Sequence, residues 1–314
     1  MNGIFIGRVI KQRREELGLS QEQLCEGICT PATLSRIENG RQAPAYNRVN
    51  ALLQRLGLPE DRYYAMMTHH EMEINQLQTR IMSAVYRYDL ASGAEKETYK
   101  EQGLQMLQDL KEQITEEDAI TGQFILSVKA VLGKKDGPYS WEEQQALFLD
   151  AIRLTVPDFD EEDILCHIYS YDEIKLITQL AVSYGAGGRH EKAIDLFGQL
   201  LKYIRKNGNI STHAAKRVPM IAYNYALQLG LAGRYADAID IAERGCQASL
   251  EICHYKFLPG LAHIRAECYY RLGKMEKSED LYRQAYYTYK LIGDEVNRPI
   301  LEAEANKYLG MTFS

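Results

Sequence analysis

Thr33 and Arg36 are spaced so that they could recognise a polar or anionic partner. A guanidinium such as that of Arg36 offers a rigid fork of hydrogen-bond donors, which suits a phosphate or the edge of a guanine base. At helical spacing Leu34 and Ile37 fall on one side of this stretch, whereas Ala32, Thr33 and Arg36 fall on the other. The sequence therefore predicts a polar face opposite an apolar one.

Helix start signals place this polar face on the second of two short helices. Ser20 is followed three residues later by Gln23, which is the pattern of a capping box. Thr30 followed by Pro31 is a second start signal, because proline at the first helical position loses no hydrogen bond. Leu24 and Ile28 are expected to pack against Leu34 and Ile37. We expect helices over 21–26 and 31–39, a turn at Gly27 and a helix end at Gly40.

The segments LSQEQL and LSRIENGRQAP resemble the helix-turn-helix of the Xre and Cro class of DNA-binding domains. In that class the second helix lies in the major groove and the first touches the DNA backbone. The turn here is one residue shorter than the usual pattern, and Cys29 occupies a position where glycine is common. The resemblance implies DNA-binding roles for Gln21, Thr30, Pro31, Ala32, Thr33, Arg36, Asn39 and Arg41.

The matched positions divide these residues by role. Gln21, Asn39 and Arg41 match phosphate contacts, and the remaining matches, from Pro31 to Arg36, face the bases. Arg36 is the best candidate for reading a guanine, a contact worth about 1–3 kcal/mol of discrimination. Arg14 and Glu38 match an ion pair of the class that ties the first helix of the domain to the end of the second short helix. The alternative is that Arg36 and Arg41 are solvated surface charges.

Length and charge predict a second, larger domain. The chain has 314 residues, more than a small DNA-binding module needs. Residues 1–67 carry nine Lys and Arg against seven Asp and Glu, a formal charge of +2, and the remainder carries 28 against 36, a charge of −8. Only the first segment suits a polyanion, and its weak charge favours dimerisation or local placement of the basic residues.

The cysteines and histidines give no clear metal site. The six cysteines form no CxxC pair, and the chain begins without a secretory leader, so we expect a reduced, cytoplasmic compartment. Cys246, Cys253 and His254 lack a second ligand pair at finger spacing. His69 and His70 with Glu71 and Glu73 are better explained as a solvated helix start. We expect no cofactor and no metal, and no apolar run is long enough to span a membrane.

The apolar periodicity predicts an all-α protein. Before residue 67 we expect a five-helix bundle, with further helices over 4–17, 46–56 and a short segment after Pro59. Beyond it, from 68 to 314, we expect a solenoid of helix pairs. The predicted pairs are 69–90 with 95–114, 117–133 with 141–155, 161–185 with 190–206, 214–231 with 235–251 and 257–272 with 275–291, followed by a capping helix over 296–310.

The last three pairs share a pattern that resembles the tetratricopeptide repeat. Each has a glycine before a charged residue at the turn, and a small residue five positions after that glycine: Ala193, Ala238 and Ser278. Small residues let paired helices approach closely. Stacked pairs form a superhelix whose inner surface is lined by the first helix of each pair. The inner-facing candidates for peptide binding are Lys175, Thr178, Tyr223, Asn224, Leu227, His263 and Glu267.

Asn224 is the most informative of these candidates. A carboxamide is both donor and acceptor, so it can hold the backbone of an extended peptide without reading its side chains. The alternative is an asparagine that bonds a neighbouring helix.

A helix-turn-helix followed by such repeats resembles the RRNPP family of peptide-sensing regulators of Gram-positive bacteria, and the shortened turn and the segment AYNYALQLGLAGRYADAIDIA are most similar to its PlcR branch. The resemblance implies a homodimer that binds double-stranded DNA at two half-sites and a short linear signalling peptide in its repeats. Asn224 matches a family asparagine that holds the peptide backbone. A second such asparagine is missing, because Thr178 or Val182 occupies its position.

Three other functions fit the same sequence. The repeats could bind a protein partner, which would make the chain a DNA-bound adaptor, or they could only dimerise a constitutive repressor. An enzyme acting on response-regulator phosphate is the third, but the sequence shows no paired nucleophile and base and no phosphate loop. We therefore expect no enzymatic activity.

Overall fold

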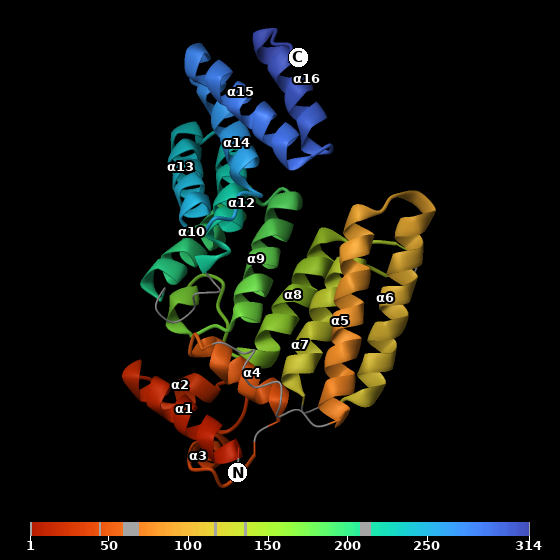
Figure 1. Cartoon of the computed structure of the whole chain (residues 1–314), viewed down its shortest axis with the longest axis vertical. Coiled ribbons are helices and arrows are strands. Elements are labelled where there is room, and N and C mark those ends of the chain that lie inside the picture. Colours follow the sequence, from red (N-terminus) through yellow and green to blue (C-terminus); the bar gives the residue numbers. More distant parts are fainter. Residues whose placement is uncertain are drawn as a thin grey trace. The chain divides into compact units, whose positions relative to one another are not determined.

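The computed structural model describes residues 2–43, 45–58, 69–115, 118–134, 137–207 and 215–313. Within these ranges the elements are α-helices and one short 3₁₀ turn, with no β-strand, which confirms the expected all-α class (Figure 1). The chain forms two compact units, Met1–Ser183 with Asn209–Ser211, and Tyr184–Gly208 with Thr212–Ser314. The two units are described separately below.

The first unit begins with the bundle predicted from the sequence. Its described helices are α1 (Asn2–Glu16), α2 (Gln21–Cys25), α3 (Pro31–Glu38) and α4 (Tyr46–Arg55). The Ser20 capping box is present, and the Thr30 hydroxyl accepts from the Thr33 amide as predicted. The expected fifth helix and the domain boundary near residue 67 lie outside the described residues, so both stay predictions.

The bundle core is a single apolar cluster at the centre of the four helices. Each helix contributes buried side chains, which are Ile6, Ile10, Leu24, Cys25, Ile28, Leu34, Ile37, Val49, Leu52, Leu53 and Leu56. Gly18 and Gly40 adopt the left-handed conformation (φ +68° in both) where the sequence predicted helix ends. The predicted apolar face of the helix-turn-helix is therefore confirmed.

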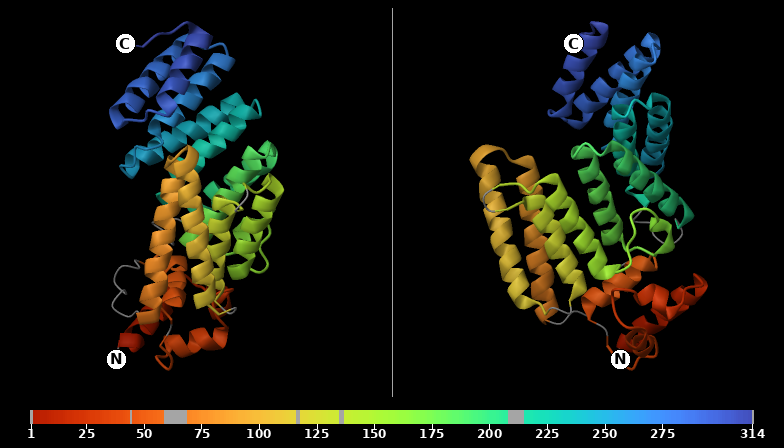
Figure 2. Two further views of the ribbon diagram at one scale, coloured as in Figure 1. Left: turned by 90° about the vertical axis from the view of Figure 1, so that its right-hand side faces the viewer. Right: turned by 180° about the vertical axis from the view of Figure 1, so that it is seen from behind.

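Two helix pairs follow within the first unit. They are α5 (His69–Leu90) with α6 (Gly93–Gln113), and α7 (Ala119–Leu132) with α8 (Trp141–Thr155). Figures 1 and 2 show the four helices side by side, with α7 also contacting α5, α6 and the bundle helix α4. These pairs match the predicted ones to within a few residues.

The predicted helix over 161–185 starts ten residues later than expected. The observed helix is α9 (Tyr171–Ala186), preceded by a 3₁₀ turn at Ile164–Cys166. Asp160 and Asp163 accept hydrogen bonds from the amides of Glu162 and Leu165, and such local bonds compete with a helix. The true start is a capping box, in which the Ser170 hydroxyl accepts from the Glu173 amide and the Glu173 carboxylate accepts from the Ser170 amide.

The second unit contains the remaining helices in repeat order. They are α10 (His190–Lys206), α12 (Val218–Leu231), α13 (Tyr235–Glu251), α14 (Leu258–Arg271), α15 (Met275–Ile292) and α16 (Asn297–Leu309). The pairs α12 with α13 and α14 with α15 pack against each other as predicted (Figure 1). The predicted first helix of the former pair, 214–231, begins at Val218 in the structure, and residue 214 lies outside the described ranges.

The glycines and small residues of the repeat pattern have the expected roles. Gly188, Gly233 and Gly273 have φ between +72° and +80° at the turns. Ala193, Ala238 and Ser278 are fully buried at the interfaces between helices. The Ser278 hydroxyl also donates to the carbonyl of Ala266 in α14, at 2.7 Å. The tetratricopeptide-like architecture of this unit is confirmed by this packing.

Candidate nucleic-acid interface and peptide site

The predicted recognition face lies on the surface of the first unit. Pro31, Ala32 and Arg36 are exposed on α3, whereas Leu34 and Ile37 on the opposite side are completely buried. The Arg36 Nε atom donates to the Ala32 carbonyl at 3.3 Å, so the side chain lies along its own helix. Nothing in the described part of this unit covers the face, which is therefore accessible to a DNA groove.

The position of α3 is fixed by a buried ion pair at its end. Arg14 donates to Glu38 from Nε at 2.6 Å and from Nη2 at 3.0 Å, and Glu38 is 3% exposed. The hydrogen bond to Glu38 raises the pKa of the Arg14 guanidinium above its usual value. This bidentate pair between α1 and α3 is the one that the sequence predicted.

The residues predicted to contact phosphates differ in their exposure. Gln21 is half-buried, and its Nε2 atom donates to Glu38 at 2.7 Å, which leaves the backbone amide as the simpler group for a phosphate. Asn39 is exposed and donates to the Ser35 carbonyl at 2.8 Å. Arg41 and Thr30 are exposed. Their DNA contacts stay predictions.

The back of the bundle is attached to later helices through Arg55, which the sequence analysis did not single out. Arg55 ends α4 and is 1% exposed. Its Nη1 atom donates to the carbonyls of Leu24 and Glu26, at 3.0 and 2.6 Å. Its Nη2 atom donates to Glu173 at 2.9 Å and to the Thr155 carbonyl at 3.3 Å. One side chain therefore joins α2, α4, α8 and α9.

Gly27 lies at the same junction. It has φ +65°, as the turn requires, and a Cβ atom here would lie 1.7 Å from the Thr155 carbonyl oxygen. Glycine is thus needed both for the turn and for the close approach to the end of α8. Nearby, the Glu26 carboxylate lies 3.2 Å from Nδ1 of His167. The turn of the helix-turn-helix is therefore part of the attachment.

The predicted peptide residues on α12 are half-buried. Asn224 donates from Nδ2 to the Met220 carbonyl of its own helix at 2.9 Å, and its side chain bonds no neighbouring helix among the described residues. Tyr223 packs against Phe257, with ring centroids 5.9 Å apart, and against Gly260. Leu227 contributes to the apolar cluster between α12, α13 and α14.

His263 and Glu267 on α14 belong to a polar and aromatic cluster with α15 and α16. The His263 Nε2 atom lies 3.3 Å from Glu304, which also accepts from the Tyr282 hydroxyl. Burial alone would raise the pKa of Glu304, but the hydrogen bond and charge of His263 lower it. Glu267 accepts from Arg271 at 3.1 Å. Both predicted residues therefore have partners within their own unit.

The two predicted peptide residues on α9 differ. Thr178 is 1% exposed and donates to the Ile174 carbonyl at 2.7 Å, so the expectation that it faces an open groove is wrong. Lys175 is half-buried and lines a cavity of about 320 Å³ in the first unit. Of the seven predicted peptide residues, it is the only one that borders this cavity.

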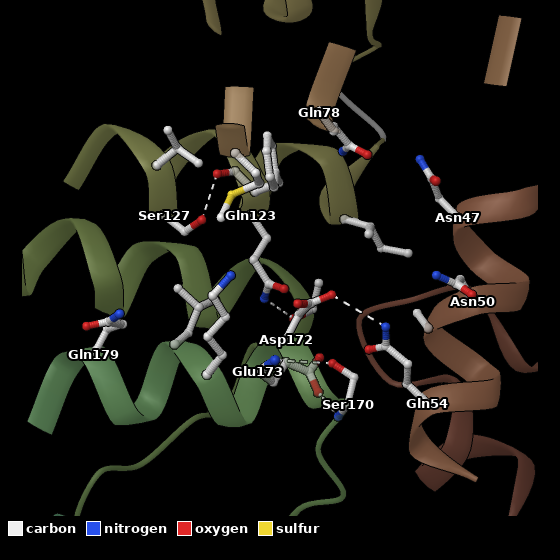
Figure 3. Close-up of a pocket in the computed structure, with 18 of the residues that line it drawn as sticks. Asn47, Asn50, Gln54, Gln78, Gln123, Ser127, Ser170, Asp172, Glu173 and Gln179 are labelled. Carbon is white, nitrogen blue, oxygen red and sulfur yellow. Dashed lines mark hydrogen bonds between the residues drawn. The ribbon is translucent and has the colours of Figure 1, made fainter. Parts of the chain in front are cut away.

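The cavity is lined by residues that the sequence analysis missed. Amide side chains from α4, α5, α7 and α9 surround it, namely Asn75 and, as labelled in Figure 3, Asn47, Asn50, Gln54, Gln78, Gln123 and Gln179. On α4 the amides at 47, 50 and 54 recur at helical spacing on the side away from the bundle core. This polar stripe on α4 was the feature of the sequence from which the cavity wall could have been predicted.

The described residues show neither a cluster of metal ligands nor a membrane-spanning helix. Within them, no three His, Cys, Asp or Glu side chains are grouped as metal ligands would be. Cys253 and His254 are exposed, and the His69 side chain lies outside the described set. No helix in the described ranges has the length and apolar character that a membrane span requires.

Comparison with protein families identifies both parts of the chain. Residues 6–63 match the model of a helix-turn-helix domain, and residues 159–310 match the RNPP family C-terminal domain. The chain is thus a helix-turn-helix protein with a helical-repeat C-terminal domain. It belongs to the RNPP family of regulators, as its sequence resemblance predicted.

Solved structures with the same fold are found among such regulators. Bacillus thuringiensis PlcR, in complex with the peptide PapR7 and DNA, superposes with a TM-score of 0.57 at 22% identity, covering 94% of this chain and 98% of that one. The apo form of PlcR superposes with a TM-score of 0.56 at 19% identity, covering 95% of this chain and 98% of that one. A cysteine-to-serine variant of the Streptococcus dysgalactiae SHP pheromone receptor Rgg2 superposes with a TM-score of 0.53 at 14% identity, covering 97% of this chain and 99% of that one. No curated protein sequence matches the chain significantly.

Proposed function

We propose that this chain is a cytoplasmic transcription regulator that binds operator DNA as a homodimer and responds to a short linear peptide bound by its repeats. The observation that carries the proposal is the combination of an exposed α3 face with a buried attachment of the same bundle to α8 and α9. The first feature suits DNA reading, and the second offers a route by which a change in the repeats could reach the reading helix.

The DNA part of the proposal assigns base reading to Arg36 and Thr33. Both lie on the accessible side of α3, and the Arg14–Glu38 pair holds the end of that helix to α1. A homodimer would present two such helices to half-sites about 34 Å apart. A ligand can alter operator binding only if it prefers one arrangement of the two domains over another.

The peptide part assigns backbone recognition to Asn224, supported by Tyr223, Leu227, His263 and Glu267. The bond from Asn224 to Met220 uses one of its two amide protons. The class of ligand is supported by Bacillus thuringiensis PlcR, a protein of the same fold whose solved structure contains the peptide PapR7 and DNA.

A gel shift with the DNA upstream of the gene, titrated with synthetic peptides encoded beside it, tests the proposal. We expect a peptide to change the apparent operator affinity of the wild type and to have no such effect on Asn224→Ala. Glu251→Ala, an exposed change at the end of α13, serves as the matched control and should respond like the wild type. A response retained by Asn224→Ala would contradict the peptide assignment.

The same measurement separates the other functions. DNA binding that no peptide alters, together with capture of one folded protein partner, would identify an adaptor. DNA binding with neither response would identify a constitutive repressor whose repeats only dimerise.

A further inference from the structure

The cavity of the first unit has a wall made by the DNA-binding bundle itself. Tyr46, Asn47, Asn50, Ala51 and Gln54 of α4 line one side. The other sides come from α5, α7, α8 and α9. A molecule in this space would touch the bundle and the repeat helices at the same time, and its site is distinct from the one assigned to Asn224.

Four half-buried amides in the lining have no hydrogen-bond partner for their side chains among the described residues. The side chains of Asn50, Asn75, Gln78 and Gln179 make no hydrogen bond to any residue that the structure describes, although all four border the cavity. A carboxamide has two donor protons and an acceptor oxygen, and the polar atoms of these four are not fully buried, so solvent or a ligand can reach them. These four groups are therefore available to a ligand that both donates and accepts.

The other amides at the cavity are already engaged. Asn47 donates to the Thr121 hydroxyl at 3.2 Å, Gln54 to Asp172 at 3.5 Å, and Gln123 to Thr155 and the Ala151 carbonyl. In Figure 3, Asn47, Asn50 and Gln54 extend from α4 toward the labelled side chains of the facing helices. The free and engaged amides thus share one space, and the engaged ones hold its walls in place.

The rest of the lining is mainly apolar, and its charged side chains carry both signs (Asp89, Asp172, Glu173 and Lys175), which favours a ligand without net charge. Met82, Val85, Phe124, Val128 and Leu176 form an apolar surface. The buried Glu173 carboxylate is already neutralised by Arg55. Transferring an ion into such surroundings costs more than transferring a neutral amide, whose polar atoms the free carboxamides can satisfy.

We infer that this cavity is a binding site for a small neutral molecule with peptide-like amide groups and apolar side chains, about the size of a dipeptide. Amide N–H and C=O groups match the four free carboxamides, and the apolar side chains match the hydrophobic wall. A volume of about 320 Å³ lies at the small end of ligand sites and can enclose a molecule of this size but not the whole of a long peptide. The inference goes beyond the proposed function and requires neither DNA binding nor the Asn224 site.

The test uses a panel of dipeptides with apolar side chains, acetylated at the amino end and amidated at the carboxyl end, on the full-length protein. Binding is measured by calorimetry and by the rise in melting temperature that a ligand of the folded state produces. We expect at least one member to bind saturably. Asn50→Leu and Gln78→Leu should each weaken that binding about tenfold, because each replaces the hydrogen-bonding amide with an apolar side chain and leaves no large cavity.

Two controls make the outcome specific. Gln76→Leu changes an exposed amide on α5 that does not line the cavity, and Asn224→Ala changes the proposed peptide site; both should bind the dipeptide like the wild type. If either cavity variant fails to fold, Gln179→Leu on α9 replaces it. The inference is overturned if no panel member binds, if the cavity variants bind as well as Gln76→Leu, or if Asn224→Ala abolishes binding.

Discussion

Two buried pairs of arginine and glutamate stabilise the DNA-binding bundle, one within it and one between it and α9. Arg14 and Glu38 join α1 to α3 across 24 positions of the sequence, and Arg55 and Glu173 join α4 to α9 across 118. The first pair completes the helix-turn-helix motif, whereas the second connects that motif to the helices behind it. The bundle's internal geometry is therefore a local property, and its attachment is a separate one that could be altered independently.

Replacing Arg55 should have the largest effect on stability. Arg55→Ala leaves Glu173 buried without its partner and removes donors from three carbonyls, so we expect the free energy of unfolding to fall by about 3–5 kcal/mol. Urea denaturation followed by circular dichroism measures this. Arg41→Ala, an exposed arginine in the same bundle, is the matched control and should change stability little.

The double variant Arg55→Met with Glu173→Gln sharpens this prediction. It removes the unpaired buried charge that either single change creates, so it should be less destabilised than the sum of the two single variants. Additive losses would mean that the two side chains do not interact as the structure shows.

The contrast between the two pairs also explains what the sequence could predict. Arg14, Glu38 and their spacing are part of a recognisable motif, and the caps at Ser20 and Thr30 are local signals. Arg55 resembles an ordinary basic residue in the last turn of a helix. Glu173 was hidden inside a predicted helix that in fact starts at Tyr171. A contact between positions so far apart leaves no periodic trace, so the junction required the three-dimensional structure.

Glu38→Gln tests the pair inside the bundle. The substitution keeps the shape of the side chain but leaves the Arg14 charge without its carboxylate. Arg14 retains its bond to the Leu19 carbonyl and lies near Glu15, so the loss should be smaller than for Arg55, about 2–3 kcal/mol. A urea midpoint lower than that of Arg55→Ala would reverse the order that we assign to the two pairs.

Substitutions at two glycines separate the cost of backbone strain from the cost of a close contact, because Gly27 lies at the junction with α8 and Gly18 lies at an open turn. Gly18 and Gly27 both have positive φ, but a Cβ atom at Gly18 would meet nothing within 4 Å, whereas at Gly27 it would collide with Thr155. Gly18→Ala should cost about 1–2 kcal/mol from the backbone alone, and Gly27→Ala should cost about 1–2 kcal/mol more, because the turn must also separate from α8. Equal urea midpoints for the two variants would contradict the close approach at the junction.

The candidate sites were predictable to different degrees, because helical periodicity is visible in the sequence whereas contacts between distant helices are not. The exposed face of α3 follows from helical periodicity and the motif, so Pro31, Ala32 and Arg36 are where the sequence placed them. Thr178 was misplaced because a repeat register inferred from glycines gives the side of a helix and not what covers it. The cavity is lined by residues from five helices that meet only after folding, and the pattern on any one helix does not reveal the others.

Arg36→Ala should have the smallest effect on stability and yet a large one on DNA. Arg36 is exposed, and among the described residues its side chain bonds only its own helix. The free energy of unfolding should therefore change by no more than about 0.5 kcal/mol. Loss of a bidentate guanine contact costs about 1–3 kcal/mol, which corresponds to roughly 5–150-fold weaker operator binding. Arg41→Ala, assigned to a phosphate, should instead weaken all sequences alike and reduce the salt dependence of binding. Titrations of both variants against the operator and a scrambled duplex at two salt concentrations distinguish these roles, and equal losses on both duplexes for Arg36→Ala would show that it reads no base.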